Sequence, residues 1–350
     1  MSRVPARLPD FYRREGPVVT VIGNEDAMNL DEARPSPVMV TASRIWRAGK
    51  TMLKAGLIVA LLATYPAMMW SAHSIDDTPV EADEIALWPA PEAGVAISLI
   101  AREVEGPGWT GDMAAWRPAT RLTAQPAWQE SLVVALADFV QLSATVVADD
   151  GETDSDLAAA SRLLRPLEDE AMTSRLIAAA EAIARYNGRV DHGLAGRLDT
   201  NPELAQAIGL FGNWAEESER EIGTLVGMPD GWPAGQSDVT AFYRARARAH
   251  VATNMLSALA ANNPDLEMSA SLRAQWREVE LLWQRIAEQS PLMVSNQNGD
   301  GLLLPNHLAS MAWRLEQAGE ATSRLAELLH GAQPDTALAE ADLVIMTTSP

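Results

Sequence analysis

The sequence predicts an all-α protein, with a single transmembrane helix followed by a multi-helix periplasmic domain of about seven or eight helices. Three observations lead to this prediction. Residues 55–72 form an uncharged run, the net charge changes sign across that run, and beyond residue 91 apolar residues recur at intervals of three and four. Such intervals place side chains on one face of a helix, and no convincing pair of strand-like segments competes with them.

The uncharged run is long enough for a membrane anchor. Its 18 residues would extend about 27 Å as a helix, which approaches the thickness of the hydrocarbon core of a bilayer, and the preceding residues can lengthen it. We therefore expect residues 51–72 to form an uncleaved transmembrane helix. The alternatives are a buried core helix, which the asymmetric flanks disfavour, and a cleaved signal peptide, which the missing small-x-small cleavage pair disfavours.

The distribution of charge indicates the orientation of this anchor. Residues 1–54 hold nine basic and six acidic residues, whereas the remaining 296 residues hold 18 arginines and 41 acidic residues. The positive-inside bias therefore places residues 1–50 in the cytoplasm as a mostly disordered tail, the anchor in the inner membrane and the C-terminal domain in the periplasm. The net charge of −20 excludes nucleic acid as a partner, because phosphate binding needs clustered basic residues.

Beyond the anchor, the sequence divides into three segments. Residues 73–91 are acidic and proline-rich and are expected to form a stalk, residues 92–330 the all-α domain, and residues 331–350 a loose tail. Apolar periodicity and prolines at helix starts predict helices over 92–105, from Pro126, over 154–165, over 168–199, from Pro202, over 238–261, over 265–289 and over 305–330. Four tryptophans on the apolar stripes are expected in the core: Trp128, Trp276, Trp283 and Trp313.

The sequence lacks the motifs that usually mark catalytic and cofactor-binding sites. It contains no cysteine, which excludes disulfides, thiolate catalysis and cysteine-bound metals. The segment 106–111 matches a dinucleotide-binding motif in its letters only, because it follows a helix and contains Pro107. The five histidines show no metal-binding spacing. We therefore predict no catalytic residue, no cofactor and no metal site.

Three arginines form the first binding candidate. Arg244, Arg246 and Arg248 stand close together in an otherwise acidic domain, where they would contact an anion such as a lipid headgroup or an acidic glycan. The alternative is that they form ion pairs with nearby acids, such as Glu216, Glu217 and Glu219.

The segment 296–301 is the second binding candidate. It resembles a calcium loop in which Asn298 and Asp300 would supply oxygen ligands, although His307 stands where such a loop has its bidentate glutamate. The alternative is a turn, in which Asn-Gly supplies a positive φ before the next helix. His307 is also the one histidine in a distinctive loop context, where a hydrogen-bonded structural role competes with a functional one.

Several blocks of the sequence are similar to one known family. They are Ile75–Pro79, Leu99–Thr110, Arg185–Gly193, Asp238–Arg244 and, as the most specific, Asn298–Leu308. Over roughly residues 52–329 the chain resembles the bacterial inner-membrane proteins catalogued as domain of unknown function 2333. The resemblance implies the same topology, with one anchor and a helical periplasmic domain, and supplies no activity or catalytic residues. The chain departs from the family in its long N-terminal tail and in a compressed stretch around 121–170.

Location and fold class together suggest two functions. The preferred one is a membrane-tethered helical binding or scaffold module that contacts an unknown protein partner in the cell envelope, because a sizeable core occurs here without a convergent catalytic set. The alternative is an envelope hydrolase that acts on cell-wall glycan, with Glu103 or Glu130 as the general acid.

Overall fold

The computed structural model describes residues 45–46, 48–60, 62–63, 75–148, 152–167, 170–228, 231–232, 234–263, 270–297 and 305–331. They belong to two units, which meet in the sequence between Leu61 and Leu62 and are described separately. All regular structure among the described residues is helical, which confirms the all-α fold class. Of the predicted tails, 1–50 and 331–350, residues 1–44, 47 and 332–350 lie outside the described residues, whereas residues 45–46, 48–50 and 331 are helical.

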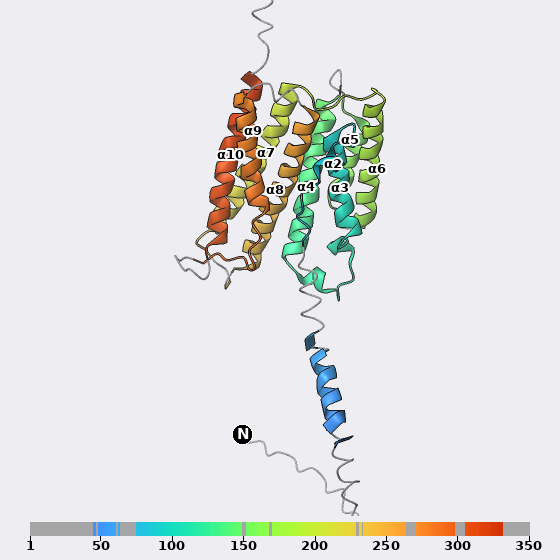
Figure 1. Cartoon of the computed structure of the whole chain (residues 1–350), viewed down its shortest axis with the longest axis vertical. Helices are drawn as coiled ribbons and strands as arrows, with labels where there is room; N and C mark the ends of the chain where they lie inside the picture. The colour runs from blue at the N-terminus through green and yellow to red at the C-terminus, as the bar shows by residue number, and fades with distance from the viewer. Residues whose placement is uncertain are drawn as a thin grey trace, which may run out of the picture. The chain divides into compact units, whose positions relative to one another are not determined.

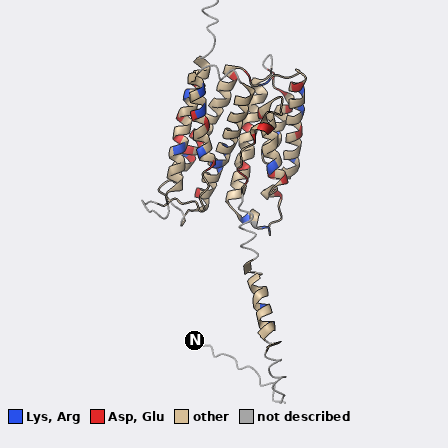
Figure 2. Ribbon diagram, in the orientation of Figure 1, with Lys and Arg blue, Asp and Glu red and all other residues tan. Residues whose placement is uncertain are grey.

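In the first unit, residues 48–60 form a helix whose apolar side chains are exposed on all sides. Met52, Leu57 and Val59 are each more than 60% exposed. The helix carries no acidic residue, its charged residues are Lys50 and Lys54, and Figure 2 shows it mostly in the colour of uncharged residues. None of the helices within the described ranges is long and apolar enough to cross a bilayer. The predicted anchor falls in part on residues that the structure does not describe, namely 61 and 64–72.

The described residues of the second unit form a bundle of eight helices of ten or more residues, preceded by the four-residue helix α2 (Figure 1). The helices are α2 (Ala82–Ile85), α3 (Pro91–Glu105), α4 (Ala124–Val146), α5 (Ser155–Leu164), α6 (Met172–Asp191), α7 (Asn201–Leu225), α8 (Gln236–Asn262), α9 (Ala270–Ala287) and α10 (His307–Gly331), with two 3-10 turns, η1 (Thr110–Asp112) and η2 (Pro118–Arg121). Helix α8 packs against α3, α4, α7 and α9, so it occupies the centre, whereas α10 packs against α7 and α9.

Local capping explains where several helices begin and end. Asp154 accepts hydrogen bonds from the free amides at the start of α5, at 3.0 and 3.1 Å. Thr200 and Glu203 form a capping box at the start of α7. The prediction of one helix over 168–199 is wrong at its C-terminal end, because Gly193 adopts a φ of 68° and the chain leaves α6 there.

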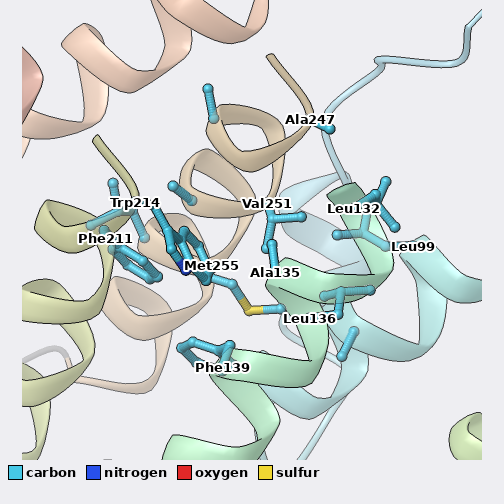
Figure 3. Packing of buried hydrophobic residues seen from close by; sticks show 14 of the residues in the cluster. Leu99, Leu132, Ala135, Leu136, Phe139, Phe211, Trp214, Ala247, Val251 and Met255 are labelled. Atoms are coloured by element: carbon cyan, nitrogen blue, oxygen red, sulfur yellow. The ribbon is translucent and has the colours of Figure 1, made fainter. Parts of the chain in front are cut away.

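The core is built from the apolar faces of the helices. Figure 3 shows Leu99 of α3, Phe139 of α4, Phe211 of α7 and Met255 of α8 packed in one cluster. The prediction of core positions is confirmed for Trp128, Trp276 and Trp283, which are buried. It is wrong for Trp313, which is 57% exposed. The buried face of α10 carries Leu308, Met311 and Leu315, and Trp313 points about 160° away from Leu315 around the helix.

The segment expected to form a stalk lies against the bundle. Val80, Ile85 and Ala90 are buried. The amide of Val80 donates to Asn254 Oδ1 at 2.7 Å, and the amide of Ala90 donates to Asn187 Oδ1 at 2.8 Å. Two side-chain amides on α8 and α6 therefore hold the backbone of this segment in place, because they supply acceptors that its extended amides would otherwise lack.

Candidate functional site

A groove of about 770 Å³ runs between α7 and α10. Its floor consists of small or apolar residues from both helices. These are Gly209, Gly212 and Ala215 of α7, and Leu315, Gly319 and Ala326 of α10. The groove is concave and mainly apolar at its base, which are the properties of a surface that binds another molecule.

The rim of the groove is acidic. Five glutamates line it, against one arginine, Arg324: they are Glu216, Glu219, Glu316, Glu320 and Glu327. Arg324 lies 3.7 Å from Glu320 and 3.7 Å from Glu278, so its charge is already shared between carboxylates. A concave surface lined by one sign of charge concentrates the electrostatic potential and attracts the opposite charge.

Glycines determine the depth of the groove. A Cβ atom at Gly319 would lie 3.4 Å from Ala215 Cβ, and one at Gly212 would lie 3.7 Å from Thr322 Cγ2, so α7 and α10 approach closely there. A Cβ atom at Gly209 would meet nothing within 4 Å. Sequence reasoning missed this site because glycine within a helix is usually a destabilising residue. The available signal was the three-residue spacing of Gly209, Gly212 and Ala215.

Two of the predicted binding arginines form ion pairs on the bundle surface. Arg248 lies 3.1 Å from Glu217 and donates to Ser218 Oγ at 3.0 Å. Arg244 lies 3.2 Å from Glu130 and 3.3 Å from Glu221. These contacts are with acids of α7 and α4, which is the kind of pairing that the alternative interpretation describes.

Arg246 is buried among α4, α8 and α9. It is 2% exposed, its Nε donates to the carbonyl of Ala287 at 2.9 Å, and its guanidinium pairs with Asp77. The guanidinium also lies 5.5 Å from the ring of Trp128. The three arginines therefore have three separate sets of partners, and the structure does not bring them together.

A second buried polar group lies beside Arg246. His250 is buried, its ring lies 5.3 Å from that of Trp128, and burial together with the charges of Arg102 and Arg246 lowers the pKa of His250 to about 4. The pKa of Glu103 is raised by burial, although its carboxylate accepts hydrogen bonds from Trp128 Nε1 at 3.0 Å and Gln129 Nε2 at 2.8 Å. These hydrogen bonds join α3 to α4 in the interior.

The calcium-like segment is described only in part. Asn298 and Asp300 lie outside the described residues. Asn296 donates to the carbonyl of Leu225 at 2.8 Å and to the buried Asp238 at 2.9 Å, so it joins the end of α7 to the start of α8. His307 begins α10; its Nδ1 accepts from the amide of Ser295 at 3.1 Å, and partial burial lowers its pKa. Among the described residues, no three His, Asp or Glu side chains form a group that could hold a metal ion.

Glu92 is a buried acid that sequence reasoning missed. It is 3% exposed, neither carboxylate oxygen has a hydrogen-bond partner, and burial raises its pKa to about 7. The charge of Arg197 and nearby backbone amides act in the opposite direction. The position next to Pro91 at the start of α3 is typical of an exposed acid favoured by the helix dipole, which is why the sequence carries no sign of this burial.

Fold and site together define the class of protein: a helical bundle with an acidic, apolar-floored groove on two of its helices. No family model matches the chain, and neither a curated protein nor a solved structure matches it significantly.

Proposed function

We propose that the protein is a membrane-tethered helical binding module of the cell envelope, held in the inner membrane through residues 51–72 with its bundle in the periplasm. The groove between α7 and α10 is the single observation that carries the binding function. Its apolar floor and five glutamates suit a basic, amphipathic segment of a partner protein, whose apolar face would lie on the floor while lysines or arginines meet the rim.

The tether is supported by the first unit and by the sequence. A helix with apolar side chains exposed on all sides is unfavourable in water and favourable in lipid. The uncharged run continues to Ala72, and both lysines of the chain, Lys50 and Lys54, lie on its N-terminal side. Membership of the family named above stays a prediction.

A substitution that fills the groove tests this function. Gly209→Trp adds an indole to the floor at a position where a Cβ atom meets nothing within 4 Å, so we expect it to fill the groove. The matched control is Gly188→Trp on α6, which is also within a helix and also faces open space. The measurement is affinity capture of the full chain from cross-linked cells in detergent. We expect a partner with the wild type and with Gly188→Trp, and its loss with Gly209→Trp.

Two outcomes would contradict the proposal. One is capture of nothing above background with the wild type even after cross-linking. The other is equal capture by Gly209→Trp and the wild type, which would place the partner elsewhere on the bundle. The thermal unfolding midpoint of both variants serves as the control for folding.

The hydrolase alternative has less support. Glu103 is 4% exposed and both of its oxygens accept hydrogen bonds inside the bundle, while Glu130 is paired with Arg244. Neither glutamate lines the groove. If Glu103→Gln or Glu130→Gln abolished the function of the protein in cells while leaving the bundle folded, the alternative would be preferred.

A further inference from the structure

The chain joins the bundle at one of its ends, which we call the proximal end. Asp77 pairs with Arg246, which in turn donates to the carbonyl of Ala287, the last residue of α9. Val80 is bound by Asn254, two turns further along α8. Residues 75–80 therefore run along α8 away from its first turn, and among them Ile75 lies nearest the end where α8 begins and α9 finishes.

The described parts of four loops lie toward the proximal end. Residues 296–297, after α9, contact the end of α7 and the segment after it, because Asn296 donates to the carbonyl of Leu225 at 2.8 Å and Gln297 donates to that of Gly231 at 3.2 Å. The loop 106–123 leads into α4 close to Trp128, which lies beside Arg246. Asp112 accepts from the amide of Met172 at 3.0 Å, so the start of α6 contacts the loop 106–123, whereas Arg165, just after α5, pairs with Asp138 further along α4.

Large apolar side chains are exposed on these loops. Among the described residues they are Trp116, Leu167, Met228, Trp232, Leu292 and Met293, with Trp232 76% and Leu292 87% exposed. The opposite end of the bundle is marked by Asn262, which donates to the carbonyl of Leu198. Its described residues expose Leu87, Leu194 and, in the last turn of α10, Leu328. Single exposed apolar residues are ordinary, but this concentration at one end is not.

We propose that the proximal end is a membrane-contact surface, whose apolar loop tips insert into the headgroup region of the bilayer that holds the anchor. This inference rests on the proposed tether. It adds a second attachment, which would fix the orientation of the bundle and turn the groove along α7 and α10 toward partners in a defined direction.

The short connection between the proposed span and the bundle supports a lipid bilayer as the occupant of this surface. Only three peptide steps separate Ala72, the last residue of the proposed span, from Ile75. Fully extended, they cover about 10 Å, which is comparable to the depth of the headgroup region on one side of a bilayer. A connection this short would keep Ile75 within reach of the headgroups, which favours lipid as the occupant of the proximal end.

The chemistry of the loop tips also suits lipid. Tryptophan, leucine and methionine are side chains that insert shallowly into the boundary between headgroups and acyl chains. Arg117 and Arg121, both exposed, follow Trp116 in the same loop and would meet lipid phosphates. A second protein would need a surface shaped to several separate loops, whereas a bilayer adapts to any arrangement of protruding apolar tips.

The absence of cysteine makes a site-specific test possible. The full chain is reconstituted in vesicles of phosphatidylethanolamine and phosphatidylglycerol, with one fluorophore attached at Trp232→Cys, Leu292→Cys, Leu87→Cys, Leu194→Cys or Leu57→Cys. All five positions are exposed, so the labels leave the core unchanged. A lipid with a spin label near its headgroup then quenches the fluorophores that contact the bilayer.

We expect quenching at positions 232 and 292, and none at the matched distal positions 87 and 194. Equal fluorescence at all four positions, with the label at 57 quenched, would overturn the membrane contact and leave the tether intact. If the label at 57 is not quenched, the tether and this inference both fail. Protection of positions 232 and 292 from aqueous iodide only after membrane proteins are added would mean that a protein covers this end, which also overturns the inference.

Discussion

Glu92 shows that burial can move the pKa of a single carboxyl group far from its usual value. Its carboxyl group is buried without a hydrogen-bond partner, and burial raises its pKa to about 7. The neutral form is therefore the one that the interior tolerates, because a charge without a partner is strongly disfavoured there. His250 is the converse case, since burial and neighbouring arginines lower its pKa to about 4 and keep it neutral.

Glu92→Gln should change how the stability of the bundle depends on pH. Between about pH 4.5 and 7 the unfolded chain has released this proton while the folded chain still holds it, so the free energy of unfolding falls as pH rises. The total loss is about 3 kcal/mol above pH 7. The glutamine variant lacks this term, so urea unfolding should find it more stable than the wild type at pH 8 but not at pH 4.5.

The free energies of unfolding of the wild type and Glu92→Gln are compared at each pH. This is necessary because His250 contributes with the opposite sign: its share of the stability is lost as pH falls from about 6.5 to 4. Parallel stability curves for wild type and Glu92→Gln across this range would show that the carboxyl ionises as it does in water.

At the scale of the element, close backbone contacts decide how helices meet their loops. A Cβ atom at Gly196 would lie 2.6 Å from the carbonyl oxygen of Val147, just beyond α4. The carbonyl of Gly196 also accepts from the hydroxyl of Tyr186 at 2.8 Å. The loop after α6 therefore packs against the end of α4 and against α6 itself. Only glycine fits at position 196, because any side chain would clash with the carbonyl oxygen of Val147.

Gly196→Ala should destabilise the bundle by about 1–3 kcal/mol, because the added methyl group clashes with a backbone atom that cannot rotate away. Gly188→Ala, within α6 and facing open space, should instead stabilise it by about 0.5–1 kcal/mol, as expected for a helix interior. Urea unfolding of both variants measures the difference. An unchanged midpoint for Gly196→Ala would mean that the loop moves freely on α4.

Much about the individual elements could be predicted from the sequence. The starts of α3 and α7 at Pro91 and near Pro202, and the eight long helices, follow from apolar periodicity and local capping. The end of α6 at Asp191 was missed because apolar residues continue at helical spacing past Gly193. Periodicity describes a face and does not by itself locate the residue at which the backbone turns.

At the scale of the whole molecule, the pair of Asp77 and Arg246 joins the first described residues of the bundle to its centre. Arg246 is buried and Asp77 is 35% exposed in its side chain. Their separation in sequence is 169 residues, so the contact closes a long loop and forms only when the bundle is assembled. It holds residues 75–80 on α8.

Asp77→Asn should loosen this segment. It leaves the guanidinium of Arg246 without its counter-charge, at a cost of about 2 kcal/mol after allowance for the partial exposure of Asp77. Amide hydrogen exchange should become faster at Val80 than in the wild type, while amides in the middle of α7 stay unchanged. Asp83→Asn, on the exposed side of α2, is the control. Equal exchange at Val80 in both variants would contradict a role of the pair in holding the segment.

The sequence by itself determined the all-α class, most helix starts and the division of charge around residue 54, because these depend on composition and on neighbours within a few positions. Only the tertiary structure decided that Arg246 meets Asp77, that Trp313 faces outward, that Glu92 is enclosed and that Gly209 opens a groove. Each of these depends on which helix faces which, and that is set by the packing of side chains far apart in the chain, which local periodicity does not record.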